Sequence, residues 1–150
     1  MRCGKELDSP QRTQRNTNRT KKGPALLVDR NQISGEVVDA AMKVHSALGP
    51  GLLESAYAAC LRHELIKRGL RVQSEVPVPI TYDGIKLEAG YKLDLLIEDT
   101  VIVELKAIEA LAPIHQAQLI SYLKPAKKPV GLLINFHSLH LKDGIKRFVV

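Results

Sequence analysis

Two neighbouring apolar runs of the chain contain charged side chains, which are costly to bury unless they are paired or bind a metal. The first run, 91–97, contains Asp94, and the second, 101–106, contains Glu104 and Lys106. Side chains two residues apart on a strand point to the same face, so Glu104 and Lys106 share one face. We therefore expect two strands whose charged side chains gather on one side.

A hairpin would bring the three charges together. Glu98-Asp99-Thr100 separates the two runs and can form the turn. Along the first strand, period-two alternation predicts that Asp94 lies on the face opposite its apolar neighbours, Leu93, Leu95 and Ile97.

Divalent-metal chemistry explains such a group of residues. Oxygen ligands suit Mg²⁺ or Mn²⁺, and Asp94, Glu104 and the backbone carbonyl of Leu105 would supply them. An ion held there neutralises a phosphate and yields hydroxide near neutral pH, as phosphodiester hydrolysis requires. Lys106 would orient the attacking water or stabilise the transition state. The other interpretation is an ordinary Glu–Lys pair on a solvent-facing strand.

The segment Gly51-Leu52-Leu53-Glu54-Ser55-Ala56-Tyr57 opens a helix and adds a further acid. Glu54 and Tyr57 are three residues apart and share a helix face. Glu54 would contact the metal or its water. Alternatively, it only stabilises the helix dipole from the first turn, next to a core tyrosine.

A later helix adds Gln118 and Tyr122, one turn apart, with His115 expected on the same side. A polar side chain on a core-facing helix needs a partner. Gln118 would hold a carboxylate or phosphate oxygen, and Tyr122 would touch the scissile strand. The basic cluster that follows is either a solvated loop or a contact to a phosphate backbone; it consists of Lys124, Lys127 and Lys128.

Caps and apolar spacing predict three helices. Ser34 is expected to cap a helix that ends near Leu48, before the Gly49-Pro50-Gly51 break. A second helix, over about 52–68, should end at Gly69. Pro113 can begin a third helix that reaches about Lys124. The inner stripe of the first helix is expected to be Val37, Ala41, Val44 and Leu48.

The extended segments predict a sheet. Pro77 and Pro79 place the first strand at an edge or give it a bulge, because proline lacks a backbone N–H. Helices, then three strands, a helix and a strand predict an α/β or α+β fold with a central mixed sheet flanked by helices. The expected strands cover 72–80, 86–98, 100–108 and 130–135, and Leu139-His140-Leu141 and Phe148-Val149-Val150 are candidates for one or two more.

Composition predicts one folded domain in a cytoplasmic protein. The 150 residues are 45% hydrophobic and 25% charged, which suits one core. No run reaches membrane-spanning length, and no leader segment is recognisable. The two cysteines, Cys3 and Cys60, have no metal-ligand spacing and favour a reducing compartment.

The net charge of +6 is concentrated in the first 30 residues. That segment carries eight Lys/Arg against three Asp/Glu, whereas the remaining 120 residues are nearly neutral, with fourteen against thirteen. We interpret 1–30 as a disordered basic arm, either nucleic-acid-binding or without a selected role, and 31–150 as the domain. Phosphate neutralisation drives nucleic-acid affinity, so strong duplex binding would require the arm, a homodimer or another partner; otherwise the substrate is short or single-stranded.

The motifs Gly51-x-x-Glu54-x-x-Tyr57, Asp94, Glu104-x-Lys106 and Gln118-x-x-x-Tyr122, in this order, resemble the GxxExxY proteins of the PD-(D/E)XK nuclease superfamily. Leu93-Asp94 departs from the superfamily's Pro-Asp. The resemblance covers about 33–150 and implies a restriction-endonuclease-like core. It also implies metal ligation by Asp94 and Glu104, a catalytic Lys106 and a helix-borne acid, Glu54.

These observations predict a metal-dependent nuclease acting on DNA, or else on RNA, with Gln118 and Tyr122 matching the motif of the exonuclease branch. A non-catalytic module that binds nucleic acid or protein and retains the fold is the alternative. A metal-dependent hydrolase of another phosphoester is a third possibility.

Removing residues 1–28 should leave the fold intact and flatten the salt dependence of nucleic-acid binding, because the arm contributes most of the net charge. Fluorescence anisotropy across a salt series checks this. An unchanged slope would show that the arm contacts no phosphates.

Overall fold

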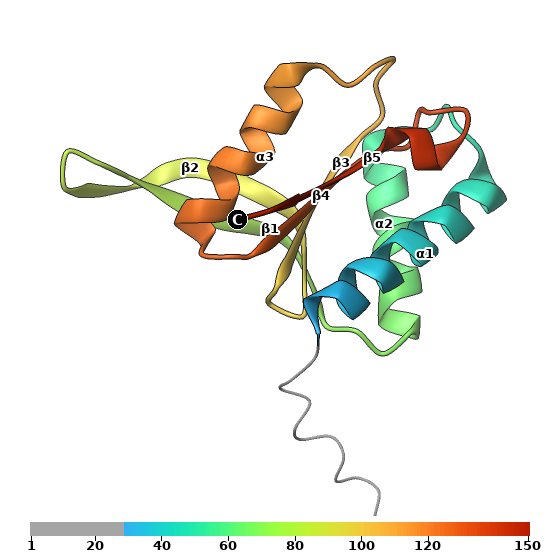
Figure 1. Cartoon of the computed structure of the whole chain (residues 1–150), viewed down its shortest axis with the longest axis horizontal. Coiled ribbons are helices and arrows are strands. Elements are labelled where there is room, and N and C mark those ends of the chain that lie inside the picture. Colours follow the sequence, from blue (N-terminus) through green and yellow to red (C-terminus); the bar gives the residue numbers. More distant parts are fainter. Residues whose placement is uncertain (1–28) are drawn as a thin grey trace, which may run out of the picture.

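One five-stranded sheet runs through residues 29–150, the part of the chain that the computed structural model describes, and carries helices on both faces (Figure 1). Helices α1 and α2 lie together on one side of the sheet, and α3 lies on the other. The elements are α1 (Arg30–Leu48), α2 (Glu54–Lys67), β1 (Val72–Tyr82), β2 (Ile85–Ile97), β3 (Val101–Lys106), α3 (Pro113–Ala126), β4 (Val130–Asn135) and β5 (Ile145–Val149).

The sheet is mixed, as predicted. Its strand order is β1-β2-β3-β4-β5; β3 and β4 are parallel, and every other neighbouring pair is antiparallel. Parallel neighbours need a crossover, and α3 supplies it between β3 and β4. The arrangement is the α/β core with flanking helices that the sequence predicted.

Two hydrophobic clusters fix the layers. The larger packs α1 and α2 against one face of β2, β3 and β4, and the smaller packs α3 against the other face. All six residues of β4 are buried, because this strand is covered on both faces. Each fully buried Leu, Ile or Val contributes roughly 1.5–3 kcal/mol, so the centre of the sheet is a rigid support for the residues at its edge.

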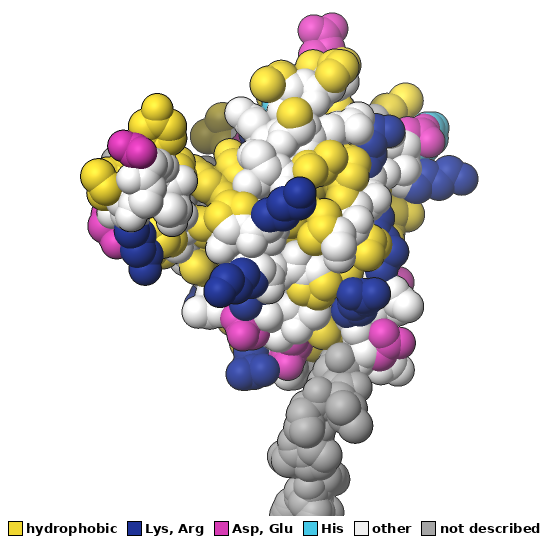
Figure 2. All heavy atoms as spheres, turned by 60° about the vertical axis from the view of Figure 1, so that its left-hand side comes forward, with side chains coloured by type: hydrophobic (Ala, Val, Ile, Leu, Met, Phe, Trp, Pro, Cys, Tyr) yellow, Lys and Arg dark blue, Asp and Glu magenta, His cyan; other side chains and the backbone are white. Residues whose placement is uncertain are grey.

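The β1–β2 hairpin follows the sequence signals closely. β1 is an edge strand, and its register shifts between Val78 and Ile80, at Pro79. Asp83 and Gly84 turn the chain with φ of 55° and 76°, as a type I′ turn requires. Gly90 is required by close packing, since a Cβ there would lie 2.0 Å from the Val78 carbonyl oxygen. The hairpin projects from the body (Figure 1), which Figure 2 shows from another side.

The start of α1 differs from the prediction. The helix begins at Arg30, and the Asp29 carboxylate caps it by accepting the Asn31 N–H at 2.9 Å. Ser34 is therefore not a cap; it lies within the helix, where its hydroxyl donates to the Asn31 carbonyl. Arg30 belongs to the folded domain rather than to the arm. Residues 1–28 of the predicted arm lie outside the described residues.

Two smaller expectations are also wrong. Leu48 is 41% exposed and does not extend the inner stripe of α1, which Val37, Ala41 and Val44 form as predicted. The segment 139–141 is not a strand: a 3₁₀ turn over Leu141–Gly144 leads directly into β5. Of the two late segments predicted as candidate strands, only Phe148-Val149-Val150 overlaps a strand of the sheet, β5.

Tyr57 anchors the loop between α1 and α2. Its ring is fully buried and stacks on Phe136, with ring centroids 4.5 Å apart. Its hydroxyl donates to the Gly49 carbonyl and accepts the Leu52 N–H. Gly51, between them, has φ of +107°, which favours glycine. The Gly-x-x-Glu-x-x-Tyr spacing thus fixes where α2 begins.

Replacing Tyr57 by Phe should lower the free energy of unfolding by about 1–2 kcal/mol, because the Gly49 carbonyl and the Leu52 N–H lose their part-buried partner while the ring stack remains. Urea denaturation measures this. Tyr82→Phe is the matched control, since Tyr82 is 74% exposed at the hairpin tip and should change stability little. Equal effects in the two variants would contradict the anchoring role.

Candidate active site

The backbone ladder between β2 and β3 ends where the charged residues begin. Its last pair is Leu95 opposite Val103, and the next positions are Asp94 and Glu104. There the carboxylates replace carbonyls: the Asp94 N–H donates to Glu104 Oε1 at 3.3 Å, and the Leu105 N–H donates to Asp94 Oδ2 at 2.8 Å. The hairpin prediction is confirmed, and it brings the two carboxylates together.

The regular pleat of β2 is interrupted at Asp94. Leu95 packs in the cluster with α1 and α2, but Leu93, two residues earlier, packs in the cluster with α3. The expectation that both lie on one face is therefore wrong. Glu75, between the β1 residues that pair with Leu93 and Leu95, has φ of +50°, which is uncommon for a non-glycine residue. A local twist of the hairpin accompanies the separation of the strands.

Burial and mutual repulsion raise the pKa values of the carboxyl groups in this region. Glu104 is 8% exposed, and burial, with the Asp94 charge second, raises its pKa to about 7. Burial also raises the pKa of Asp94, although the hydrogen bond from Leu105 opposes the shift. The pKa of Glu54, at the start of α2, is raised by burial and then by Asp94. Such a site favours a cation.

Lys106 lies on the same strand face as Glu104, as predicted, because Val101, Val103 and Leu105 all pack into the cluster on the opposite face. Its ammonium charge opposes the rise in the pKa of each of the three carboxyl groups, which burial drives. The structure thus brings Glu54, Asp94, Glu104 and Lys106 within electrostatic range of one another.

The backbone of Leu105 faces the gap between the strands. Its N–H points toward β2, where it meets Asp94. Because the N–H and C=O of one strand residue point to the same side, the Leu105 carbonyl also faces β2. The next carbonyl, that of Lys106, points the other way and accepts the Phe136 N–H at 2.8 Å. This orientation is the one that a backbone metal ligand at Leu105 would need.

A cleft of about 480 Å³ lies between α2 and the parting strands. Glu54 and Asp94 line it together with Leu105 and Glu75, and Arg62 is the basic residue among its lining. Glu54 therefore lies across the cleft from Asp94, on a helix whose start Tyr57 fixes.

Two tyrosines lie on the other side of the carboxylates. The rings of Tyr122, from α3, and Tyr91, from β2, stack with centroids 3.5 Å apart. Burial raises the pKa of Tyr91 to about 12, with Tyr122 and then Glu104 contributing, and burial with Glu104 and Asp94 raises the pKa of Tyr122. Tyr122 thus lies near the site, as expected, and Tyr91 was missed because an aromatic residue in a strand is typical of a core.

Gln118 and His115 are placed differently from Tyr122. Gln118 is exposed on α3, one turn before Tyr122, so burial does not require a partner for it. His115 caps the helix, since its Nδ1 accepts the Ala112 N–H at 2.8 Å. His115 therefore has a structural role at the start of α3, and a role for Gln118 stays a prediction.

A family model of the PD-(D/E)XK nuclease superfamily matches residues 31–148. The chain belongs to this superfamily. Neither a curated protein nor a solved structure gives a significant match. Asp94 and Glu104-x-Lys106 have the residue types of the Asp and the Glu-x-Lys in the superfamily's name, and their role as its motif stays a prediction. The narrower resemblance to GxxExxY proteins stays a prediction.

The donor set of this PD-(D/E)XK site fits a hard divalent cation such as Mg²⁺, since it offers two carboxylates that repel each other and an oriented carbonyl. Within residues 29–150, no three His, Cys, Asp or Glu side chains are grouped so as to hold an ion by themselves. A bound ion would thus depend on Asp94, Glu104, the Leu105 carbonyl and water. Over the same residues, no helix is long and apolar enough to cross a membrane.

The raised pKa of Glu104 predicts a stability change that does not depend on activity. The folded state holds a proton on Glu104 up to about pH 7, whereas the group ordinarily ionises near 4.5. Stability from this group is therefore full below pH 4.5 and is lost as the pH rises through 7. Glu104→Gln removes the charge and keeps an acceptor for the Asp94 N–H.

In EDTA at pH 8, Glu104→Gln should raise the free energy of unfolding by about 2–3 kcal/mol, and the gain should shrink toward pH 5. Adding Mg²⁺ should stabilise the wild type and not the variant. Thermal unfolding measures both effects, with the exposed Glu109→Gln as control. A variant no more stable than wild type at pH 8 would show that the ionised Glu104 carboxylate does not destabilise the folded state.

Proposed function

We propose that this superfamily member is a Mg²⁺- or Mn²⁺-dependent nuclease of the cytoplasm that hydrolyses phosphodiester bonds of DNA, or else of RNA. The observation that carries the proposal is the pair of hydrogen bonds by which Asp94 and Glu104 bridge the parting strands, with the charges of Lys106 and Glu54 within electrostatic range. A structural salt bridge would neutralise these charges. Instead, two acids are held together with one lysine.

Each residue has a role that follows from its position. Asp94 and Glu104, with the Leu105 carbonyl, would hold the divalent ion, which neutralises the phosphate and lowers the pKa of an attacking water. Lys106, next to them, places its positive charge on the phosphate oxygens as negative charge develops there. Glu54 lines the cleft beside α2 together with Asp94, and its pKa is raised, so it is suited to exchange a proton with water.

The α3 side would contact the substrate. Tyr122 lies within electrostatic range of Glu104 and Asp94, so a nucleotide bound at the carboxylates would meet its ring. Gln118, one turn earlier and exposed, is free to reach a phosphate oxygen. The nearly neutral body favours DNA binding that draws on the basic arm or on a homodimer.

A cleavage assay tests this function. The purified chain should cut labelled DNA or RNA with Mg²⁺ or Mn²⁺ and not with EDTA, and Asp94→Asn, Glu104→Gln and Lys106→Met should each lose roughly a hundredfold or more of the rate. Glu109→Gln serves as the matched control, because this carboxylate is exposed and lies beyond β3. Its rate should equal that of wild type.

Two results would contradict the proposal. Cleavage that persists in Asp94→Asn or Glu104→Gln would come from another site or from a contaminant. Failure to cut any single- or double-stranded DNA or RNA, by a chain that binds them and is stabilised by Mg²⁺, would instead indicate a non-catalytic binding module.

A further inference from the structure

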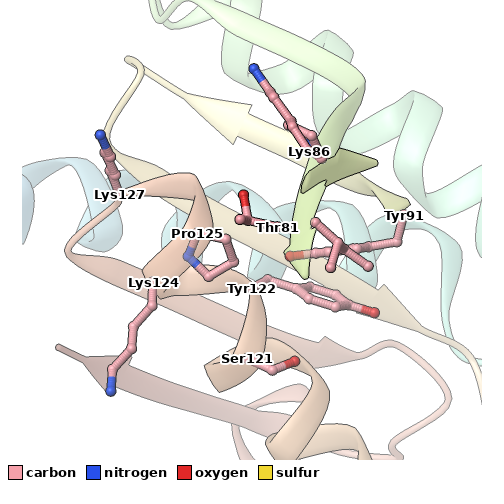
Figure 3. A pocket seen from close by; sticks show the side chains of 10 residues that line it. Thr81, Lys86, Tyr91, Ser121, Tyr122, Lys124, Pro125 and Lys127 are labelled. Atoms are coloured by element: carbon pink, nitrogen blue, oxygen red, sulfur yellow. The ribbon is translucent and has the colours of Figure 1, made fainter. Parts of the chain in front are cut away.

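A groove of about 770 Å³ lies between the β1–β2 hairpin and α3, on the side of the carboxylates opposite to α2. Lys86 contributes from β2, and Lys124 and Lys127 contribute from the end of α3. In Figure 3 the Tyr122 ring lies in the middle of the groove, with Lys124 and Lys127 on one side and Lys86 across from them. The groove is therefore walled by two separate elements.

The charge of the groove is all of one sign. Three of its ten lining residues are lysines and none is acidic, whereas the charged residues that line the cleft near α2 are three acids and one base: Glu54, Glu75, Asp94 and Arg62. Neighbouring Lys128 does not join the set, because its ammonium pairs with Asp99 at 2.8 Å. On the face that Figure 2 shows, basic side chains are scattered rather than gathered into one large patch. A basic groove on a nearly neutral body indicates an anionic ligand.

The groove lies near the carboxylate site, although neither Asp94 nor Glu104 lines it. Tyr91 and Tyr122 line the groove, and the charge of Glu104 reaches both rings. Tyr91 also precedes Asp94 by three residues on β2. Its hydroxyl is buried without a hydrogen-bond partner among the described residues, so a polar ligand in the groove could supply one. An anion that occupies the groove would therefore end beside the metal ligands.

The lining of the groove suits a single strand. Its volume lies within the roughly 300–1,000 Å³ typical of small-molecule pockets, so it has room for a short stretch of nucleotides. Lysines contact phosphates, and stacked aromatic rings offer a surface for bases; this combination is typical of single-strand binding.

We propose that this groove binds single-stranded nucleic acid, with Lys86, Lys124 and Lys127 on its phosphates and the Tyr91–Tyr122 stack against a base, and leads it to Asp94 and Glu104. The inference deepens the nuclease proposal. It rests on that proposal for one point, that the bound strand continues from the groove to Asp94 and Glu104. The ligand itself is recognised by charge and stacking, and these need no metal.

Binding of a fluorescein-labelled oligothymidylate to the full chain in EDTA tests the groove. Lys86→Gln with Lys124→Gln should weaken binding about tenfold and reduce the slope of log K against log salt by roughly 1.4, at about 0.7 for each lost phosphate contact. The matched control is Lys142→Gln with Lys146→Gln, which removes the same charge at two exposed sites, one just before β5 and one on it. This variant should alter the affinity less than twofold. Thermal unfolding should show both double variants folded.

The outcomes separate the two proposals. Equal losses in both double variants, a loss confined to duplex DNA, or no binding of single strands by wild type would overturn the groove. Groove-dependent binding without cleavage in Mg²⁺ would refute the nuclease and leave the groove standing. If the double variant Lys86→Gln with Lys124→Gln cleaves single strands with Mg²⁺ at the wild-type rate, the groove is refuted and the nuclease proposal stands.

Discussion

The exchange of hydrogen bonds between Asp94 and β3 is the constraint on which the rest of the site depends. A buried backbone N–H without a partner is costly, so strands that part inside a protein need substitutes for the lost ladder. The carboxylates of Asp94 and Glu104 provide them, and the same two bonds fix both side chains. Strand separation and carboxylate placement are therefore one feature. The irregular Glu75 and the close approach at Gly90 accommodate the resulting turn of the hairpin.

Local patterns predicted those parts of the fold that local chemistry determines. Pro79 lies at an irregularity of an edge strand, and the alternation along β3 places Glu104 and Lys106 on one face, both as predicted. Other predictions were wrong because residues elsewhere in the chain compete with the local pattern. Asp29 precedes Ser34 and caps α1 first, and Leu93 changes face because of a twist that involves another strand. Neither outcome is visible in a window of a few residues.

The distribution of charge over the folded body also could not be predicted from local sequence. Counting residues indicates a body of almost no net charge, and this is correct as a sum. Folding separates the charges: three acids and one arginine line the cleft beside α2, whereas three lysines, two tyrosines and no acid line the groove beside α3. A site that binds a cation and a polyanion needs this separation, since mixed charges would satisfy one another. Composition cannot reveal it, because the groove joins residues from β2 and α3.

The energetics of Glu104 argue for a function beyond the fold. A buried carboxylate beside another carboxylate is less favourable than a neutral side chain of the same shape, and burial and the Asp94 charge raise the pKa of Glu104 accordingly. A structural role would be better served by glutamine, which keeps the acceptor that the Asp94 N–H needs. Stability is instead supplied elsewhere, by the fully buried β4 and by the Tyr57 anchor. A residue that weakens the ion-free fold, at the point where a cation would reverse its effect, is placed for chemistry rather than for packing.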